Sequence, residues 1–448
     1  MHDSVRRLIR LGATSNLANL LQKQHPADLA QVLGELAERD RRTAFDLALD
    51  RNRRLAMEAL SELGPEAGAS LLADRSADEI ARLLQELPSD DVAAILNHLS
   101  DELSADVLEL MRRKEGVEVG SLLEYAEQTA GRIMNPHVFA LAEDMTVGEA
   151  ITTLQNARDV EMVFYLYVID GRRHLVGVVS LRRLLLVSPD TPLKRIMSAE
   201  VISVQDDMDQ EEVARQVASY NLLAIPVVDK ENKLVGVITV DDVIDVIKDE
   251  ATEDIYRLAG VSADERVFTV PSVSLRRRLP WLLVNLGTAF LAASVVRVFQ
   301  GTISKVVALA AFMPIVAGMG GNAATQTLTV IVRGIALGEL TWANTKSALL
   351  KEGLVGLGNG VTLGLVAAGG AWLLMGDWVL GLILGLAMVI NMFVAATTGT
   401  LIPIALRALK VDPALASSVF ITTLTDVFGF LSFLGLATVF LQYLHRAG

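Results

Sequence analysis

The sequence contains no cysteine, which excludes disulfide bonds, a thiolate metal site and a cysteine nucleophile. Its beginning, MHDSVRRLIRLGATSN, lacks the apolar core and processing site of a secretion signal, so we expect the N-terminal part to stay in the cytoplasm. No nucleophile-base pair, phosphate loop or metal-ligand helix motif is present, which argues against an enzyme. Charge is also scarce at one end, where the last 168 residues hold only 8 Lys or Arg and 5 Asp or Glu. We therefore expect a membrane domain there.

The charge is concentrated in the first 280 residues instead. They hold 32 Lys or Arg against 48 Asp or Glu, a net charge of −16, whereas the remainder has a net charge of +3. An acidic surface repels phosphate groups and attracts cations. These counts argue against nucleic acid as a partner and favour cations. At 448 residues the chain is multidomain, with an acidic soluble part before the membrane part.

Residues 1–130 have the pattern of short helices. Apolar residues recur at three- and four-residue spacing, as at Ile80, Leu83 and Leu84, and Pro26 and Pro88 each precede acids where a helix would begin. We predict an all-α superhelical domain of acidic surface, and on composition alone it could be a packing module with no chemistry of its own.

Residues 131–248 contain an internal repeat. Arg132-Ile133-Met134 aligns with Arg195-Ile196-Met197, and residues 175–180 align with residues 234–239. Each copy mixes helical and strand periods, as in a β-α-β unit. These residues resemble a tandem CBS pair, an α+β module that often binds adenosine nucleotides.

The CBS resemblance implies a nucleotide motif, Gly-x-x-Thr-x-x-Asp, whose acid holds the ribose. The second copy has it as Gly236, Thr239 and Asp242, while the first copy has Arg183 where the acid would stand. The resemblance therefore implies one site, for ATP or another adenosine nucleotide. A regulatory pair that binds no nucleotide is the alternative.

Residues 239–260 are predicted to form one connecting helix, followed by a linker to residue 275. An apolar stripe runs from Ile244 to Leu258, and Gly260 ends the helix. Residues 241–254 carry seven acids against the single Lys248, and residues 206–212 form a second acidic run. Like charges four residues apart destabilise a helix. If the two runs face each other, the folded state needs cations between them.

The membrane domain, residues 276–448, contains five apolar segments at about 281–299, 303–335, 348–375, 378–406 and 413–444. Basic residues favour the side on which the soluble part lies, by eight to three. The eight are Arg276, Arg277, Arg278, Arg333, Lys346, Lys351, Arg407 and Lys410, and the three are Arg297, Lys305 and Arg446. The positive-inside rule then predicts a multi-pass protein of the inner (plasma) membrane with a cytoplasmic N-terminal part and an external C-terminus.

The second apolar segment contains a stretch of helix-breaking residues that begins at Pro314. The run continues through Gly320, Gly321 and Asn322 to Gln326, and we interpret it as non-helical backbone that lines an aqueous pathway. A glycine kink for close packing is the alternative. In the third segment Gly356, Gly360 and Gly364 predict close helix packing.

The fifth segment has an acid near its middle. Asp426 follows Thr422 and Thr423, and an uncompensated carboxylate at this depth costs several kcal/mol unless it faces water or a cation. It is the only acid deep in a predicted span, whereas Glu352 and Asp377 stand at span ends, where a solvated role suits them. A structural hydrogen bond to a neighbouring helix is the alternative for Asp426.

Taken together, the domain order and the membrane motifs resemble the MgtE family of magnesium channels or transporters. The resemblance implies a homodimer in the lipid bilayer whose pore receives hydrated Mg²⁺ at Asp426, and a connecting "plug" helix that closes the pore when intracellular Mg²⁺ binds the cytosolic domains. By position it implies a set of regulatory acids: Asp209, Glu211, Asp242, Asp245, Glu250, Glu253 and Asp254. The chain departs from the family pattern at Ala94, Asn221 and Ser418-Val419.

The chemistry fits this role, because Mg²⁺ keeps several waters and prefers few carboxylates among hydroxyl and amide groups. No histidine cluster favours a softer metal. Two alternatives stay open: a broader carrier that also takes Mn²⁺ or Co²⁺, and a membrane-anchored nucleotide-sensing regulator whose spans only anchor it.

Overall fold

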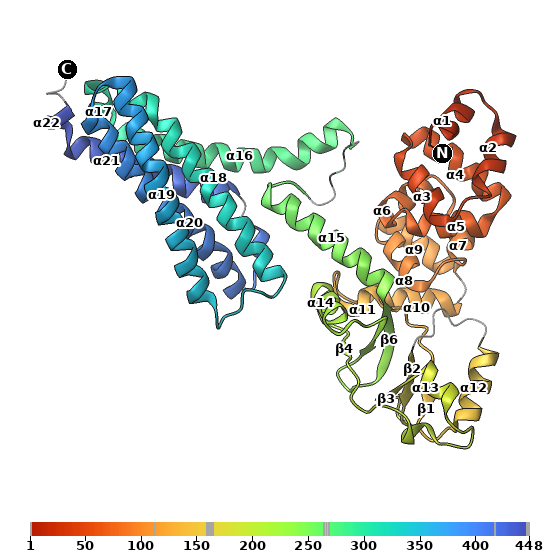
Figure 1. The fold of residues 1–448 in the computed structure, drawn as a ribbon. Coiled ribbons are helices and arrows are strands. Elements are labelled where there is room, and N and C mark those ends of the chain that lie inside the picture. Colours follow the sequence, from red (N-terminus) through yellow and green to blue (C-terminus); the bar gives the residue numbers. More distant parts are fainter. Residues whose placement is uncertain are drawn as a thin grey trace. The chain divides into compact units, whose positions relative to one another are not determined.

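The computed structural model describes residues 2–111, 113–157, 165–262, 265, 267, 269–415 and 418–444. The chain forms two compact units, Met1–Ile247 and Lys248–Gly448 (Figure 1). One helix, α15 (Val240–Leu258), runs through the boundary between them.

Short helices fill the beginning of the first unit, as predicted. They are α1 (His2–Arg10), α2 (Thr14–Leu21), α3 (Pro26–Glu35), α4 (Glu38–Arg51), α5 (Arg53–Glu62), α6 (Pro65–Leu72), α7 (Ala77–Leu84), α8 (Ser89–Leu96), α9 (Asp101–Leu110) and α10 (Arg113–Glu124). Local sequence starts them: Pro26 is the first residue of α3, and the hydroxyls of Ser76 and Ser100 cap α7 and α9. Their apolar faces share one core with fully buried Phe45 and Leu84.

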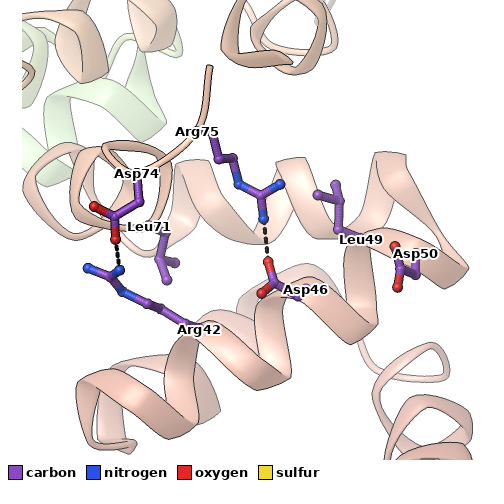
Figure 2. Close-up of a pocket in the computed structure, with 7 residues that line it drawn as sticks. All are labelled: Arg42, Asp46, Leu49, Asp50, Leu71, Asp74 and Arg75. Atoms are coloured by element: carbon purple, nitrogen blue, oxygen red, sulfur yellow. Dashed lines mark hydrogen bonds and ion pairs between the residues drawn. The ribbon is translucent and has the colours of Figure 1, made fainter. Parts of the chain in front are cut away.

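A shallow hollow of about 320 Å³ lies on the surface of this array (Figure 2). Arg42 and Asp46 of α4 face Asp74 and Arg75 of the turn after α6, and each arginine is ion-paired with the acid opposite it. Because both cations are already matched, these pairs link the two helices and leave no unmatched charge to attract an anion.

The repeat folds as two similar three-stranded sheets, which confirms its β-α-β pattern. The first copy holds α11 (Ala130–Ile133), β1 (Ala140–Ala142), α12 (Val147–Asn156), β2 (Tyr165–Ile169), β3 (Leu175–Ser180) and α13 (Leu181–Leu186). The second holds the short η1 (Leu193–Arg195), β4 (Val204–Gln205), α14 (Gln210–Tyr220), β5 (Ala224–Val228) and β6 (Leu234–Thr239). In each sheet the first two strands are parallel and the last two antiparallel.

The two copies exchange one side chain each. Met197 of the second copy lies against Gly177 of the first, where a Cβ would be 2.5 Å from its Sδ. Met134 of the first copy lies against Gly236 of the second, where a Cβ would be 2.6 Å from its Sδ. Both glycines are therefore required by close approach.

The second unit contains five helices long and apolar enough to cross a membrane, in agreement with the prediction. They are α16 (Pro271–Val298), α18 (Ala308–Ala336), α19 (Thr345–Met375), α20 (Trp378–Ala408) and α21 (Ser418–Val439), with short α17 (Gln300–Lys305), η2 (Pro413–Leu415) and α22 (Leu441–Leu444) between or after them. The most buried is α20, which packs against α18, α19 and α21.

The small residues of α19 pack as predicted. A Cβ at Gly356 would lie 2.6 Å from Cβ of Ala396, and one at Gly364 would lie 2.8 Å from the carbonyl oxygen of Gly385. Gly360 is equally crowded by α20. Close approach of backbones is a usual way for membrane helices to gain dispersion energy.

The predicted interruption of the second span is wrong. Residues 308–336 form one continuous helix that includes Pro314, Gly320 and Gly321. Glycine weakens helices in water because it loses more backbone conformational entropy than other residues. In hydrocarbon an unpaired backbone group costs several kcal/mol, so the helix persists. Proline removes one hydrogen bond of the ladder and is tolerated there.

Candidate ion pathway and regulatory sites

One face of α18 is polar and exposed. Pro314 and Gly318 begin it, and the exposed Asn322, Thr325 and Gln326 continue it at helical spacing. Neither Asn322 nor Gln326 forms a hydrogen bond with any residue that the structure describes. A polar stripe on an apolar span is costly in lipid, so it must face water or another protein surface.

Gly320 and Gly321 lie on the opposite, packed face of α18. A Cβ at Gly320 would come within 2.2 Å of the Asn391 side chain of α20, and one at Gly321 would lie 3.2 Å from Cγ2 of Thr422 on α21. The structure thus divides the predicted motif: Pro314, Asn322 and Gln326 are exposed, and the two glycines allow helix contact.

Asp426 lies in the middle part of α21 and is partly buried. It forms no hydrogen bond or ion pair with the other described residues, so no bond to a neighbouring helix accounts for it. Two contacts place it along α18: Gly321 meets Thr422, and Val316 meets Gly429, where a Cβ would be 3.2 Å from Cγ1 of Val316. Asp426 is therefore level with residues 316–321 of α18.

The hydroxyls near Asp426 bond within their own helix. Thr422 and Thr423 both donate to the carbonyl oxygen of Val419, at 3.1 and 2.6 Å. Their oxygen lone pairs stay available to accept hydrogen bonds from water. The side chain of Ser418 and all of Arg446 lie outside the described residues.

Glu352 corrects another expectation, because it is not solvated. Its side chain is buried, one oxygen accepts a 3.3 Å hydrogen bond from Thr327 of α18, and the other pairs with Lys351. Position near the end of α19 does not expose it, because α19 packs against α20 and Thr327 of α18 reaches the carboxylate. Asp377, by contrast, caps α20 by accepting from the amides of Val379 and Leu380.

The predicted regulatory acids lie on several elements. Asp209 caps α14 by accepting from the amide of Glu211, and Glu211 pairs with Arg215. Asp245, Glu250, Glu253 and Asp254 lie along α15. Among the described residues, no three acidic or histidine side chains are close enough to hold a metal ion within one chain. Asn221 ends α14 with φ of 51°, a left-handed conformation that asparagine tolerates.

Three acids nevertheless influence one another inside the first unit. Burial raises the pKa of Asp90 well above its usual value, and the charges of Asp242 and Asp91 raise it further. One oxygen of Asp90 is buried without a partner among the described residues. Burial also raises the pKa of Asp242 to about 6, with the charges of Asp241 and Asp91 adding to it. At neutral pH the charged forms of these carboxylates are destabilised by burial and by repulsion from one another. Binding of a proton or a cation would reduce that cost.

The nucleotide motif of the second copy lies at the end of β6 and the start of α15. Thr239 donates a 2.7 Å hydrogen bond from its hydroxyl to Asp242. Met134 and the carbonyl of Asn135 crowd Gly236. In the first copy Ser180 caps α13 by accepting from the amide of Arg183, so an arginine occupies the equivalent position.

The end of α15 is anchored in the second unit. Arg257 forms ion pairs with Glu253, one turn earlier, and with Asp412, in the segment after α20. Leu258 packs against an apolar cluster that includes Ala324 of α18, Ala395 of α20 and Ile421 of α21. Gly260, with φ of 69°, then turns the chain against Trp281.

Comparison with known families divides the chain into three matched parts. The family described as a divalent cation transporter matches residues 313–436, the MgtE intracellular N domain matches residues 24–128, and CBS domains match residues 130–190 and 193–249. The cytosolic domain of the Mg²⁺ channel MgtE, crystallised in complex with ATP, is similar in structure: it is 37% identical, with a TM-score of 0.51, and covers 55% of this chain and all of that one.

Individual relatives give the same result. The magnesium transporter MgtE of Thermus thermophilus is 38% identical over 337 residues, or 75% of each chain. The magnesium transporter MgtE of Enterococcus faecalis is 39% identical over 335 residues, 74% of this chain and 73% of that one. These relatives are transporters rather than enzymes, as the motifs predicted. The chain belongs to the MgtE family of magnesium transporters.

Proposed function

We propose that this protein is a Mg²⁺-selective channel or transporter that imports Mg²⁺ through a pore between two copies of the chain. The observation that carries this proposal is the exposed polar stripe on α18 together with Asp426 on the adjoining α21, a carboxylate with no hydrogen bond or ion pair among the described residues. Such groups inside a span mark an ion route.

The same stripe supports a homodimer. Asn322 and Gln326 are exposed at the surface of a single membrane unit, so one chain alone does not enclose them. A second copy related by a twofold axis would place two stripes and two Asp426 carboxylates opposite each other. The resulting polar pore suits a cation that keeps its water shell, since amides, hydroxyls and carbonyls can bond those waters.

Selectivity over Mn²⁺ and Co²⁺ is part of the proposal. Those ions exchange water for nitrogen and sulfur ligands more readily than Mg²⁺, and the pathway side chains named above offer oxygen and amide groups. A carrier that admits all three ions is the competing reading, and competition between the ions separates the two.

We further infer that intracellular Mg²⁺ closes the pore through α15. The helix is continuous from residue 240 to residue 258, and its last turn is attached to the membrane unit by Arg257 and Leu258. Binding of Mg²⁺ among Asp209, Glu211, Asp242, Asp245, Glu250, Glu253 and Asp254 would reduce their repulsion and favour the closed position of the helix. The ion can shift the equilibrium only by the difference between its affinities for the two states.

ATP or another adenosine nucleotide is proposed as a second ligand, at Gly236, Thr239 and Asp242. The support is the ribose-type acid in the second copy and the ATP in the crystal structure of the related cytosolic domain. A nucleotide at this position would contact the first residues of α15.

For topology, we propose a cytoplasmic N-terminal part and an external C-terminus. The absence of cysteine makes the test direct, because a single introduced thiol reports its own side of the membrane. Gly301→Cys should react with an impermeant maleimide in intact cells, and Ala343→Cys should react only after permeabilisation. The reverse result would overturn the orientation.

Flux through purified protein tests the central proposal. Mg²⁺ uptake into proteoliposomes should be lost in both Asp426→Ala and Asp426→Asn, since the asparagine keeps the shape and removes the charge. Asn359→Leu, which changes an exposed amide of α19, serves as the matched control and should transport normally. Normal uptake in either Asp426 variant, with folding and dimerisation intact, would refute the pathway.

A further inference from the structure

The side chain of Asn391 lies where three membrane helices meet. It belongs to α20, is 1% exposed, and donates a 2.8 Å hydrogen bond from Nδ2 to the carbonyl oxygen of Val316 on α18. Nothing in the local sequence marks it, because it is a single amide in a long apolar segment.

Two glycines on the other helices make room for this amide. A Cβ on Gly320 of α18 would be 2.2 Å from Nδ2 of Asn391, and a Cβ on Gly429 of α21 would be 2.8 Å from the same atom. Real Cβ atoms do not approach so closely, so the amide sets how near the three helices lie to one another at this point.

This junction adjoins the proposed pathway on both of its sides. Val316 and Gly320 lie on α18 between Pro314 and Asn322, while Gly429 lies on α21 one turn after Asp426. Residue 391 therefore contacts both helices that carry the proposed pathway, close to the stripe of α18 and to Asp426.

The amide is poorly explained by packing alone. Its Oδ1 is buried and accepts no hydrogen bond from the residues that the structure describes. An unpaired buried acceptor is unfavourable, whereas a leucine of similar volume would fill the same space with no polar atom. The side chain supplies a directed bond to Val316 at the cost of that unpaired oxygen.

We propose that Asn391 is a positioning residue that sets cation specificity, by fixing residues 316–322 of α18 at a defined distance from Asp426. The proposal rests on the pathway described under Proposed function. A pore of defined width distinguishes hydrated ions by size, so a displaced α18 changes the preference between ions as well as the rate.

Competition flux in proteoliposomes tests this with Asn391→Leu, and with Asn359→Leu as the matched control. The ratio of Mg²⁺ to Co²⁺ uptake should change by about tenfold, equivalent to about 1.4 kcal/mol, in Asn391→Leu alone. Thermal stability and dimer content are measured in parallel. An unchanged ratio, or an equal loss for both ions, would overturn the proposal.

A double variant distinguishes loss of this specific contact from a general folding defect. Gly320→Ala should impair uptake because its methyl group meets the amide, and adding Asn391→Ala should restore part of the rate by removing that amide. No restoration in a stable double variant would count against the contact. If Asp426→Asn transports normally, the pathway itself fails; if Asp426→Asn is inactive while Asn391→Leu keeps its ion ratio, only the role of Asn391 fails.

Discussion

Arg257, one residue before the end of α15, is ion-paired with Asp412, which follows the last turn of α20. Both side chains are about two-thirds shielded from solvent. The pair joins the helix that begins in the first unit to the membrane unit, next to the contact of Leu258 with α18, α20 and α21. Under the proposed gating through α15, this pair is a point at which closure can be weakened without changing the proposed pathway.

Breaking this pair should loosen closure by Mg²⁺. Asp412→Ala should raise the cytosolic Mg²⁺ concentration for half closure by up to about fivefold, because a partly exposed ion pair contributes at most ~1 kcal/mol. Mg²⁺ flux at graded internal Mg²⁺ measures this. The swapped variant Arg257→Asp with Asp412→Arg should recover the original midpoint, and a midpoint that stays shifted in the swap would indicate a role other than pairing.

The acids of the connecting helix, together with Asp209, should determine whether internal Mg²⁺ can close the pore. Changing Asp209, Asp245, Glu250 and Asp254 together to Ala should leave a pore that no longer closes as internal Mg²⁺ rises, since the neutral side chains neither repel nor bind the ion. Protease protection of the 248–275 linker should increase with Mg²⁺ in the wild type only. Equal protection in both proteins would mean that the acids are merely solvated.

The raised pKa of Asp242 predicts a pH dependence of the first unit. Its folded-state pKa of about 6 exceeds the ordinary 3.8, so the stabilisation from protonation is fully present below pH 4 and is lost as pH rises through 6. The loss is about 3 kcal/mol at 1.36 kcal/mol per pKa unit. This loss of stability can be measured by hydrogen exchange of α8 in Mg²⁺-free buffer. After correction for intrinsic exchange rates, the amides of α8 should exchange faster at pH 7 than at pH 5.

Asp242→Asn should flatten that profile, and saturating Mg²⁺ at pH 7 should slow exchange in the wild type if the cation takes the place of the proton. The same steep profile in the variant would assign the effect to another group.

Nucleotide binding should be limited to one molecule per chain. Calorimetry with ATP should give that stoichiometry in the full protein, because Arg183 replaces the ribose acid in the first copy. Asp242→Ala should abolish binding, while Asp241→Ala, its exposed neighbour, should retain it. Two nucleotides per chain would contradict this assignment of the first copy.

Sequence patterns were sufficient where the physical signal is local and periodic. The helical spacing of Ile80 and Leu84, the repeat of 131–248 and the lengths of the five spans all depend on neighbours along the chain. Gly320 and Gly321 misled because glycine indicates a break in water, whereas in a membrane helix it allows contact with Asn391 and Thr422.

Glu352 and Asn391 were beyond prediction for a different reason. The position of Glu352 along α19 can be counted from the sequence, but its burial depends on Thr327 of another helix. Asn391 acquires its role from Val316, Gly320 and Gly429, which are far away in the chain. Tertiary neighbours of this kind leave no periodic trace.

The exchanged methionines limit how the repeat can be divided. Met134 of the first copy packs against the second, and Met197 of the second copy packs against the first. Each copy therefore depends on the other for one of its packed side chains. If the chain is cut between residues 190 and 193, the two fragments should fold only when they are mixed. A single copy expressed alone would leave the space beside its glycine unfilled. The two copies should therefore fold as one unit, and a substitution at Met134 or Met197 should affect mainly the copy that the side chain packs against.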